Sequence, residues 1–205
     1  DIEKRHKDSR VGAIRDLTFS NITIVSDNGI LVQGMAASKI ENLILRNISM
    51  RVDRGFDYSG RKKHVGGSTS QTEDRRPTIY AQKPSYVTLA NVKALTVDGL
   101  RVFIPAAVFA RYERSALSLH EAEGAAVSDV VRVPAGQESK VPVIMMENCR
   151  TAFLTRCFAP PGTGVVLGIE GENTADISLT GNDLKRAKTS VRLSAQVPAS
   201  QVSNQ

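Results

Sequence analysis

Six residues between positions 80 and 114 have the side-chain types that sugar-binding sites combine. They are Tyr80, Lys83, Tyr86, Arg111, Tyr112 and Arg114. Such sites pair an aromatic face with the sugar ring, and Arg or Lys side chains with its carboxylates. The set therefore suggests a surface for an acidic sugar. The alternative is that the tyrosines of the phrase YAQKPSY pack beneath a corner of the fold.

Two histidines are further candidates, because imidazole changes its charge near neutral pH. His64 follows three basic residues, which suits a loop that contacts a uronate carboxylate; the alternative role of this loop is solubility. His120 lies in the phrase LSLHEAEG, where period-2 alternation would place Glu121 and Glu123 on one face. Glu121 and Glu123 therefore indicate either a two-carboxylate site or a solvated turn.

Metal and cofactor sites are not indicated, because two Cys and three dispersed His match no zinc-ligand spacing. A net charge of +6 favours polyanions as partners. The basic residues are scattered and lack interleaved aromatic residues, so we expect no nucleic-acid partner. No apolar run approaches the roughly 20 residues that span a bilayer, so we expect no membrane span, and the charged opening DIEKRHKDSR is no signal peptide.

The elements that must position these residues follow from an internal repeat. IRDLTFSNITI at 14–24 returns as IENLILRNISM at 40–50 and VKALTVDGLRV at 92–102. Weaker copies begin at Ala122, Cys149 and Thr174. The sixth place of the copies holds Phe19, Leu45, Val97, Val127, Leu154 and Leu179, separated by 26, 52, 30, 27 and 25 residues. A period in this range is typical of a solenoid.

The eighth place of the repeat predicts a sharp bend once per period. It holds Asn21, Asn47, Gly99, Asp129, Arg156 and Gly181. Five of these are Asn, Asp or Gly, which tolerate a left-handed backbone. The strands around them are short and rich in Val, Ile and Leu, and no helical stripe is present. We therefore predict an all-β, right-handed parallel β-helix of about 25–30 residues per coil.

Stacking of equal residues follows from this architecture, since successive coils lie about 4.8 Å apart. Aliphatic side chains are expected in inward columns, and Asn21 and Asn47 in a hydrogen-bonded ladder. Cys149 and Cys157 occupy the first and ninth places of their copy, which are inward. We expect both to be buried free thiols, because eight residues of strand separate them too widely for a disulfide.

The organisation along the chain is predicted in three parts. Residues 1–10 form a charged lead-in, residues 11–195 the β-helix, and residues 196–205 a polar tail. The aperiodic stretch 51–77 explains the doubled separation if it leaves the coil as a long polar loop, a usual place for function. Because a solenoid end exposes core and strand edge, we expect the first coil to be capped by an N-terminal part of the same β-helix or by another subunit.

The amino-acid pattern of the repeats resembles that of the C-terminal half of the polygalacturonase-like proteins of glycoside hydrolase family 28. The segments on which this resemblance rests are VGAIRDLTFSNITI, GILVQGMAASKIENLILRNISM, RPTIYAQKPSYVTLANVKALTVDGLRV and RYERSALSLHEAEGAAVSD. The resemblance implies inverting hydrolysis of pectic or other acidic polysaccharide by paired carboxylic groups. It also implies a secreted, periplasmic or cell-surface location. The family's Asn-Thr-Asp, Asp-Asp, Gly-His-Gly and Arg-Ile-Lys motifs do not occur in this chain, so no catalytic residue is carried over.

Three functions therefore compete. The chain is the C-terminal β-helix portion of a pectin-active glycosidase, a non-catalytic polysaccharide-binding or trimeric, tailspike-like adhesin, or part of a polysaccharide lyase. Because the acid motifs are missing, the binding or adhesin function is favoured for this chain by itself. The amino-acid pattern of the repeats favours descent from a glycosidase. The lyase is disfavoured because no clustered Asp ligands for Ca²⁺ occur.

Overall fold

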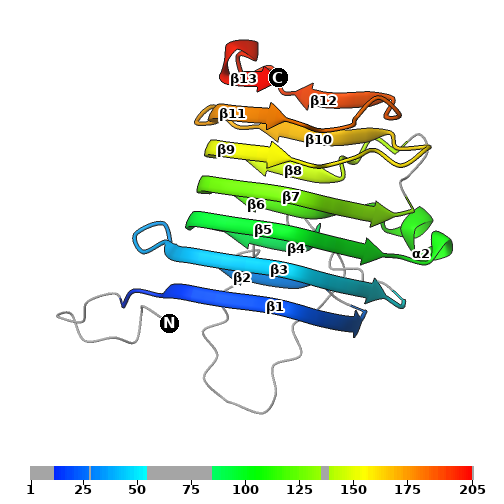
Figure 1. The fold of residues 1–205 in the computed structure, drawn as a ribbon, viewed down its shortest axis with the longest axis horizontal. Helices are drawn as coiled ribbons and strands as arrows, with labels where there is room; N and C mark the ends of the chain where they lie inside the picture. Colours follow the sequence, from blue (N-terminus) through cyan, green and yellow to red (C-terminus); the bar gives the residue numbers. More distant parts are fainter. Residues whose placement is uncertain (1–11, 28, 55–84, 135–138, 205) are drawn as a thin grey trace, which may run out of the picture.

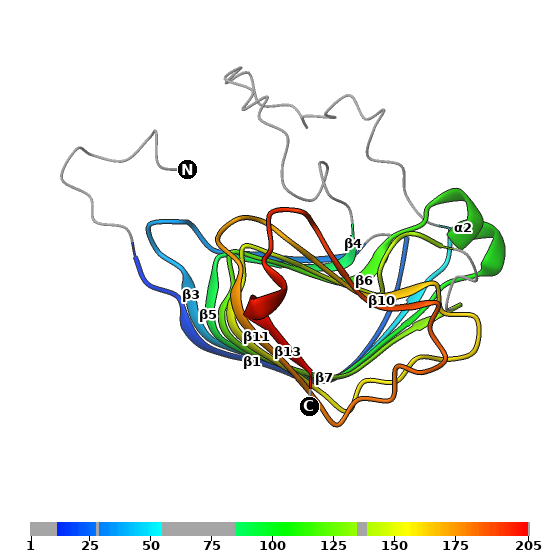
Figure 2. The same cartoon turned by 90° about the horizontal axis from the view of Figure 1, so that it is seen from above.

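The computed structural model describes residues 12–27, 29–54, 85–134 and 139–204. These residues form a parallel β-helix of about six turns, which confirms the expected fold class (Figure 1). Two parallel sheets run along the stack, and Figure 2, which looks along it, shows the strands of successive coils superposed.

The long-strand sheet has seven strands and the short-strand sheet has six. The long-strand sheet contains, in spatial order, β1 (Arg15–Ser26), β3 (Ile40–Val52), β5 (Val92–Phe103), β7 (Glu123–Val133), β9 (Arg150–Thr155), β11 (Ala175–Thr180) and β13 (Val202–Asn204). The short-strand sheet contains β2 (Ile30–Gln33), β4 (Ser85–Ala90), β6 (Ser115–His120), β8 (Ile144–Glu147), β10 (Val165–Glu170) and β12 (Thr189–Leu193). Helix α2 (Ala106–Arg111) joins β5 to β6, and a 3₁₀ turn, η2 (Ala199–Gln201), precedes β13.

The strand register confirms the repeat alignment residue by residue. Phe19 pairs with Leu45, Leu45 with Val97, and Val97 with Val127. The column continues through Leu154 and Leu179. The doubled separation lies between β3 and β5, which are nevertheless direct neighbours. Residues 51 and 52 still belong to β3, and residues 55–77 of the expected loop lie outside the described residues.

The corner predicted at the eighth place is confirmed. All six residues there have positive φ: Asn21 (55°), Asn47 (50°), Gly99 (76°), Asp129 (53°), Arg156 (54°) and Gly181 (64°). The expected amide ladder is present as well, because Nδ2 of Asn47 donates to Oδ1 of Asn21 over 2.9 Å. Arg156 is a residue type that the pattern did not lead us to expect in this conformation. Its guanidinium contacts Asp98 at 2.9 Å and Asp129 at 3.0 Å, which ties it to the coils below.

The core is a tube of aliphatic side chains between the sheets. Leu43, Leu95, Leu117 and Leu167 are among the residues it buries almost completely. Cys149 and Cys157 also lie there as free thiols, as expected. Burial raises the pKa of the Cys149 thiol to about 12 and raises that of Cys157 as well. Both thiols are therefore protonated and chemically inert at neutral pH.

The C-terminal segment differs from the expected polar tail. Within the segment 196–205, the described residues include η2 and β13. Strand β13 pairs in parallel with β11, with Val202 opposite Ile177. The phrase VSN is too short and polar to be recognised as a strand by itself. It adopts strand geometry because the exposed edge of β11 supplies backbone partners in register.

Candidate functional site

A second corner, which the repeat did not reveal, connects the short-strand sheet to the long-strand sheet. Asn91, Glu121, Asn148 and Gly171 stand there in successive coils with φ of 52°, 54°, 52° and 89°. Their backbones are bonded from coil to coil: Glu121 N donates to Glu147 O over 3.0 Å, and Asn148 N donates to Glu170 O over 3.1 Å. We call this column of residues the pocket corner, because Glu121 and Asn148 line a pocket together with residues next to them.

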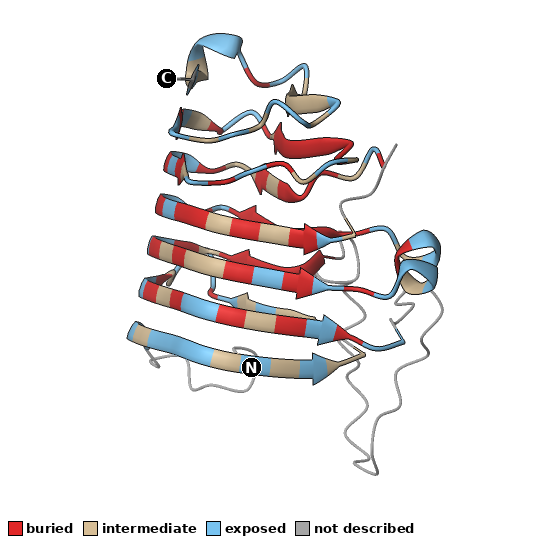
Figure 3. Ribbon diagram, turned by 45° about the vertical axis from the view of Figure 1, so that its right-hand side comes forward, coloured by how far each residue is buried: buried red, intermediate tan, exposed pale blue. Residues whose placement is uncertain are grey.

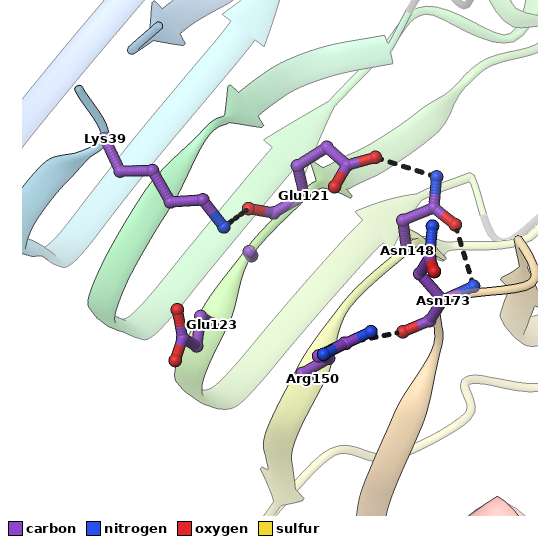
Figure 4. A pocket seen from close by; sticks show the side chains of 7 residues that line it. Lys39, Glu121, Glu123, Asn148, Arg150 and Asn173 are labelled. Atoms are coloured by element: carbon purple, nitrogen blue, oxygen red, sulfur yellow. Dashed lines mark hydrogen bonds between the residues drawn. The ribbon is translucent and has the colours of Figure 1, made fainter. Parts of the chain in front are cut away.

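A polar pocket of about 370 Å³ lies at the pocket corner. It is lined by Lys39, Glu121, Ala122, Glu123, Asn148, Arg150 and Asn173. Figure 4 shows that these side chains come from different coils and face one open space. Its volume is within the range of small-ligand sites, but its lining is charged and amide-bearing instead of apolar. Such a lining suits a hydroxyl-rich or carboxylate-bearing ligand.

A chain of hydrogen bonds fixes the pocket wall across the coils (Figure 4). Nζ of Lys39 donates to the carbonyl of Glu121 over 3.0 Å, two coils away. Nδ2 of Asn148 donates to Oε1 of Glu121 over 2.8 Å, and Oδ1 of Asn148 accepts from the backbone of Asn173 over 3.2 Å. Nε of Arg150 donates to the carbonyl of Asn173 over 3.1 Å. These bonds hold the lining groups in place before any ligand arrives.

Several lining groups keep hydrogen-bonding capacity for a ligand. Of the guanidinium nitrogens of Arg150, only Nε donates to an acceptor among the described residues, so both Nη atoms lack a partner there. The Glu123 carboxylate has no hydrogen-bond or ion-pair partner in the described part of the chain, and the residue is exposed. A guanidinium with two free terminal nitrogens can bind a carboxylate in the bidentate manner. The pocket can therefore accept hydroxyl donors at Glu123 and an anion at Arg150.

The residues that sequence analysis grouped around α2 do come together, but not as an open sugar site. The guanidinium carbons of Arg111 and Arg114 lie 5.1 and 5.5 Å from the centre of the Tyr112 ring. The hydroxyl of Tyr86 donates to the carbonyl of Tyr112 over 3.1 Å. Tyr86 is buried, which raises the pKa of its hydroxyl to about 12, and it offers no ring face to a ligand. Arg114 is buried as well, so of the four members that the structure describes, Arg111 and Tyr112 are the accessible ones.

Arg132 explains why this cluster is closed. The residue is only 1% exposed, and its guanidinium carbon lies 4.7 Å from the centre of the Phe109 ring on α2. Nη1 donates to the carbonyl of Arg114 over 2.8 Å. Burial lowers the pKa of Arg132 to about 10, so it stays charged at neutral pH and holds α2 against the coils. Arg132 stands at the eleventh place of its repeat copy, in register with the buried Val102, so the alignment already placed it on the inward face.

The buried His120 pairs with the half-buried Glu147 beside the pocket corner. His120 is 2% exposed, and its Nδ1 lies 2.8 Å from Oε2 of Glu147. Each is followed directly by a lining residue, Glu121 and Asn148. His120 is therefore not part of the pocket lining, and the pair lies directly beside two residues that are. Its two candidate partners, Glu121 and Glu123, both line the pocket.

Three candidates, His64, Tyr80 and Lys83, lie outside the described residues. Sequence analysis missed Lys39, Asn148, Arg150 and Asn173, because they are far apart along the chain. A signal existed: Glu123 and Arg150 share the second place of the repeat, so the alignment already placed them side by side.

Within the described residues, no group of three or more His, Cys, Asp or Glu side chains is placed to hold a metal ion. None of the described helices has the length and apolarity that crossing a membrane requires.

The fold places the chain in the class of parallel β-solenoid proteins. Comparisons with protein-family models, curated proteins and solved structures found no match to it.

Proposed function

We propose that this chain binds an acidic polysaccharide in the pocket at the pocket corner, as the C-terminal β-helix portion of a polygalacturonase-like glycosidase. The observation that carries the binding proposal is the lining itself. Lys39 and Arg150 supply cations, Asn148 and Asn173 supply amides, and hydrogen bonds between coils hold them in place. The kinship with pectin-active enzymes is supported by the wording of the repeats.

Binding would follow from the chemistry of each group. The free Nη atoms of Arg150 would hold a uronate carboxylate in a bidentate bond, and Lys39 would add a second positive charge. The amides and the Glu123 carboxylate would accept hydrogen bonds from sugar hydroxyls. By the family resemblance, we propose that the protein works outside the cytoplasm, at a cell surface, in the periplasm or as a secreted protein.

Calorimetric titration with an oligogalacturonate tests the binding proposal. Because a hydrogen bond to a charged group contributes about 1.5–3 kcal/mol, Arg150→Gln should weaken binding at least about tenfold. Arg101→Gln is the matched control, since Arg101 is an exposed arginine elsewhere on the long-strand sheet. It should change the dissociation constant less than about twofold. Equal losses in both variants, or no binding by the wild type, would refute the proposal.

A second candidate function is hydrolysis by the chain itself, favoured by the two carboxylates that line one opening, Glu121 and Glu123. Glu121 is held by Asn148, whereas Glu123 is free among the described residues, so the two groups have different surroundings. Different surroundings are what an acid and a base require. Release of reducing ends from polygalacturonate by the wild type, and its loss in both Glu121→Gln and Glu123→Gln, would establish this activity.

A further inference from the structure

A column of alternating charges runs along the outside of the long-strand sheet and through the pocket. It consists of Arg15, Glu41, Lys93, Glu123 and Arg150, the second place of five successive repeat copies, and we call it the charge column. Each member pairs in strand register with the next. All stand at the starts of their strands, along the left edge of the sheet in Figure 1.

The spacing of the charge column follows from the geometry of the sheet. Neighbouring strands lie about 4.8 Å apart, so opposite charges alternate at this distance along the column. Like charges are therefore roughly 9.6 Å apart, twice the strand spacing. The cations stand on β1, β5 and β9, and the carboxylates stand on β3 and β7 between them.

The charges of the column are available to a ligand. All five residues are exposed. Although they are neighbours in register, none forms an ion pair with another member among the described residues. The only hydrogen bond of a column side chain in the described structure is that from Nε of Arg150 to Asn173, which leaves its two Nη atoms without an acceptor there. Glu123 and Arg150 also line the pocket, so the column continues its binding surface along the stack.

We propose that the charge column selects a polysaccharide that carries a carboxylate on every second sugar, bound along the stack axis. The inference rests on the proposed binding function and names its substrate class. A sugar ring advances a chain by about one strand spacing, so alternate sugars would meet Lys93 and Arg150 while those between meet Glu41 and Glu123. A chain with a carboxylate on every sugar would place anions against both Glu residues, and this repulsion disfavours it. A neutral sugar that faces Glu41 or Glu123 would instead donate hydrogen bonds from its hydroxyls to the carboxylate.

A purely structural role for the column makes a different prediction. Opposite charges on adjacent strands attract and help to maintain the register, even where they are exposed. If that were the whole role, neutralising Glu41 and Glu123 would change stability and leave the choice of ligand unaffected. The two roles are therefore separated by measuring binding preference and thermal unfolding on the same variants.

The experiment compares three probes of equal length by calorimetry: an oligogalacturonate, an alternating galacturonate–rhamnose oligomer and a hyaluronan oligomer. The wild type should bind both alternating probes about fivefold more tightly than the uniform one, the effect of one unit charge at about 4 Å in water. Unspecific attraction to a chain of net charge +6 would give the opposite order. In Glu41→Gln/Glu123→Gln the preference should disappear because the uniform probe gains affinity.

The control is Glu172→Gln/Asp176→Asn, which removes the same two charges at exposed positions outside the column. It should keep the wild-type preference. Equal or tighter binding of the uniform probe by the wild type, or an unchanged preference in the Glu41/Glu123 variant, would overturn the inference. The binding function would survive either result if Arg150→Gln still weakened all three probes, whereas no binding of any probe would refute both.

Discussion

Strands β1 and β3 carry the same apolar pattern and the same corner Asn, yet their side chains have different surroundings. Phe19 on β1 is 41% exposed, whereas Leu45, its partner in register on β3, is 3% exposed. Figure 3 shows the difference along the whole length of the strands: β1 has no residue in the buried class, and β3 alternates between buried and accessible residues. The repeat therefore specifies which way a side chain points, and neighbouring coils decide how far it is buried.

The physical reason is that burial in a solenoid needs strands on both sides. β3 lies between β1 and β5, whereas β1 pairs only with β3 among the described strands. An inward residue of β1 therefore contacts the core from one side. The same amino acid should contribute less to stability there than one coil further along.

The largest effect is expected for truncation of matched leucines in these two strands. Leu43→Ala should lower the free energy of unfolding by about 2–5 kcal/mol, because Leu43 is fully buried and its removal leaves a cavity. Leu17→Ala, its partner in register, should cost clearly less, since Leu17 is only partly buried. Urea unfolding followed by circular dichroism measures both losses. Equal losses would show that β1 is as well packed as β3.

A smaller difference, of about 1–3 kcal/mol, is expected between two corner glycines that share a positive φ but differ in their neighbours. A Cβ at Gly171 would lie 2.8 Å from the backbone nitrogen of Asn148 and closer still to its side-chain oxygen. A Cβ at Gly181 would meet nothing within 4 Å. Gly181→Ala should therefore cost only the left-handed strain of about 1–2 kcal/mol. Gly171→Ala should cost about 1–3 kcal/mol more from overpacking.

The corner glycine pair also tests the pocket, because Asn148 accepts a hydrogen bond from the backbone of Asn173. If displacement of Asn148 opens the pocket wall, Gly171→Ala should weaken oligogalacturonate binding while Gly181→Ala leaves it unchanged. Thermal unfolding with and without the oligosaccharide measures both effects. Identical behaviour of the two variants would mean that the wall does not depend on Asn148.

The smallest effect is expected at the Asn ladder that joins β1 to β3. Asn47→Gly keeps the backbone angle and removes the bond to Asn21, at a cost of about 0.5–1.5 kcal/mol. Asn47→Ala removes the same bond and keeps a Cβ at φ of 50° without the local hydrogen bonding by which Asn tolerates this conformation, so it should cost about 1–2 kcal/mol more than the Gly variant. Urea unfolding of the two variants separates the bond from the backbone strain. A Gly variant less stable than the Ala variant would contradict this order.

Much of the fold was predictable because a parallel β-helix repeats its requirements once per coil. The column from Phe19 to Leu179 and the positive φ at Asn21 and Gly99 follow from such local requirements. The pocket was predictable only in part. Glu121 and Glu123 were noticed as neighbours in sequence, whereas Lys39 reaches Glu121 from two coils away. Such a contact depends on the conformation of a long side chain, which no repeat specifies.

The sequence by itself determined the solenoid, its register and the corner at the eighth place of the repeat, because strand alternation and left-handed backbone tolerance are properties of single residues and their spacing. Only the tertiary structure decided that Tyr86 and His120 are buried and that both Nη atoms of Arg150 lack an acceptor among the described residues. Burial and hydrogen-bond pairing depend on which other coils and helices cover a side chain. That covering is set by packing between segments far apart in the chain.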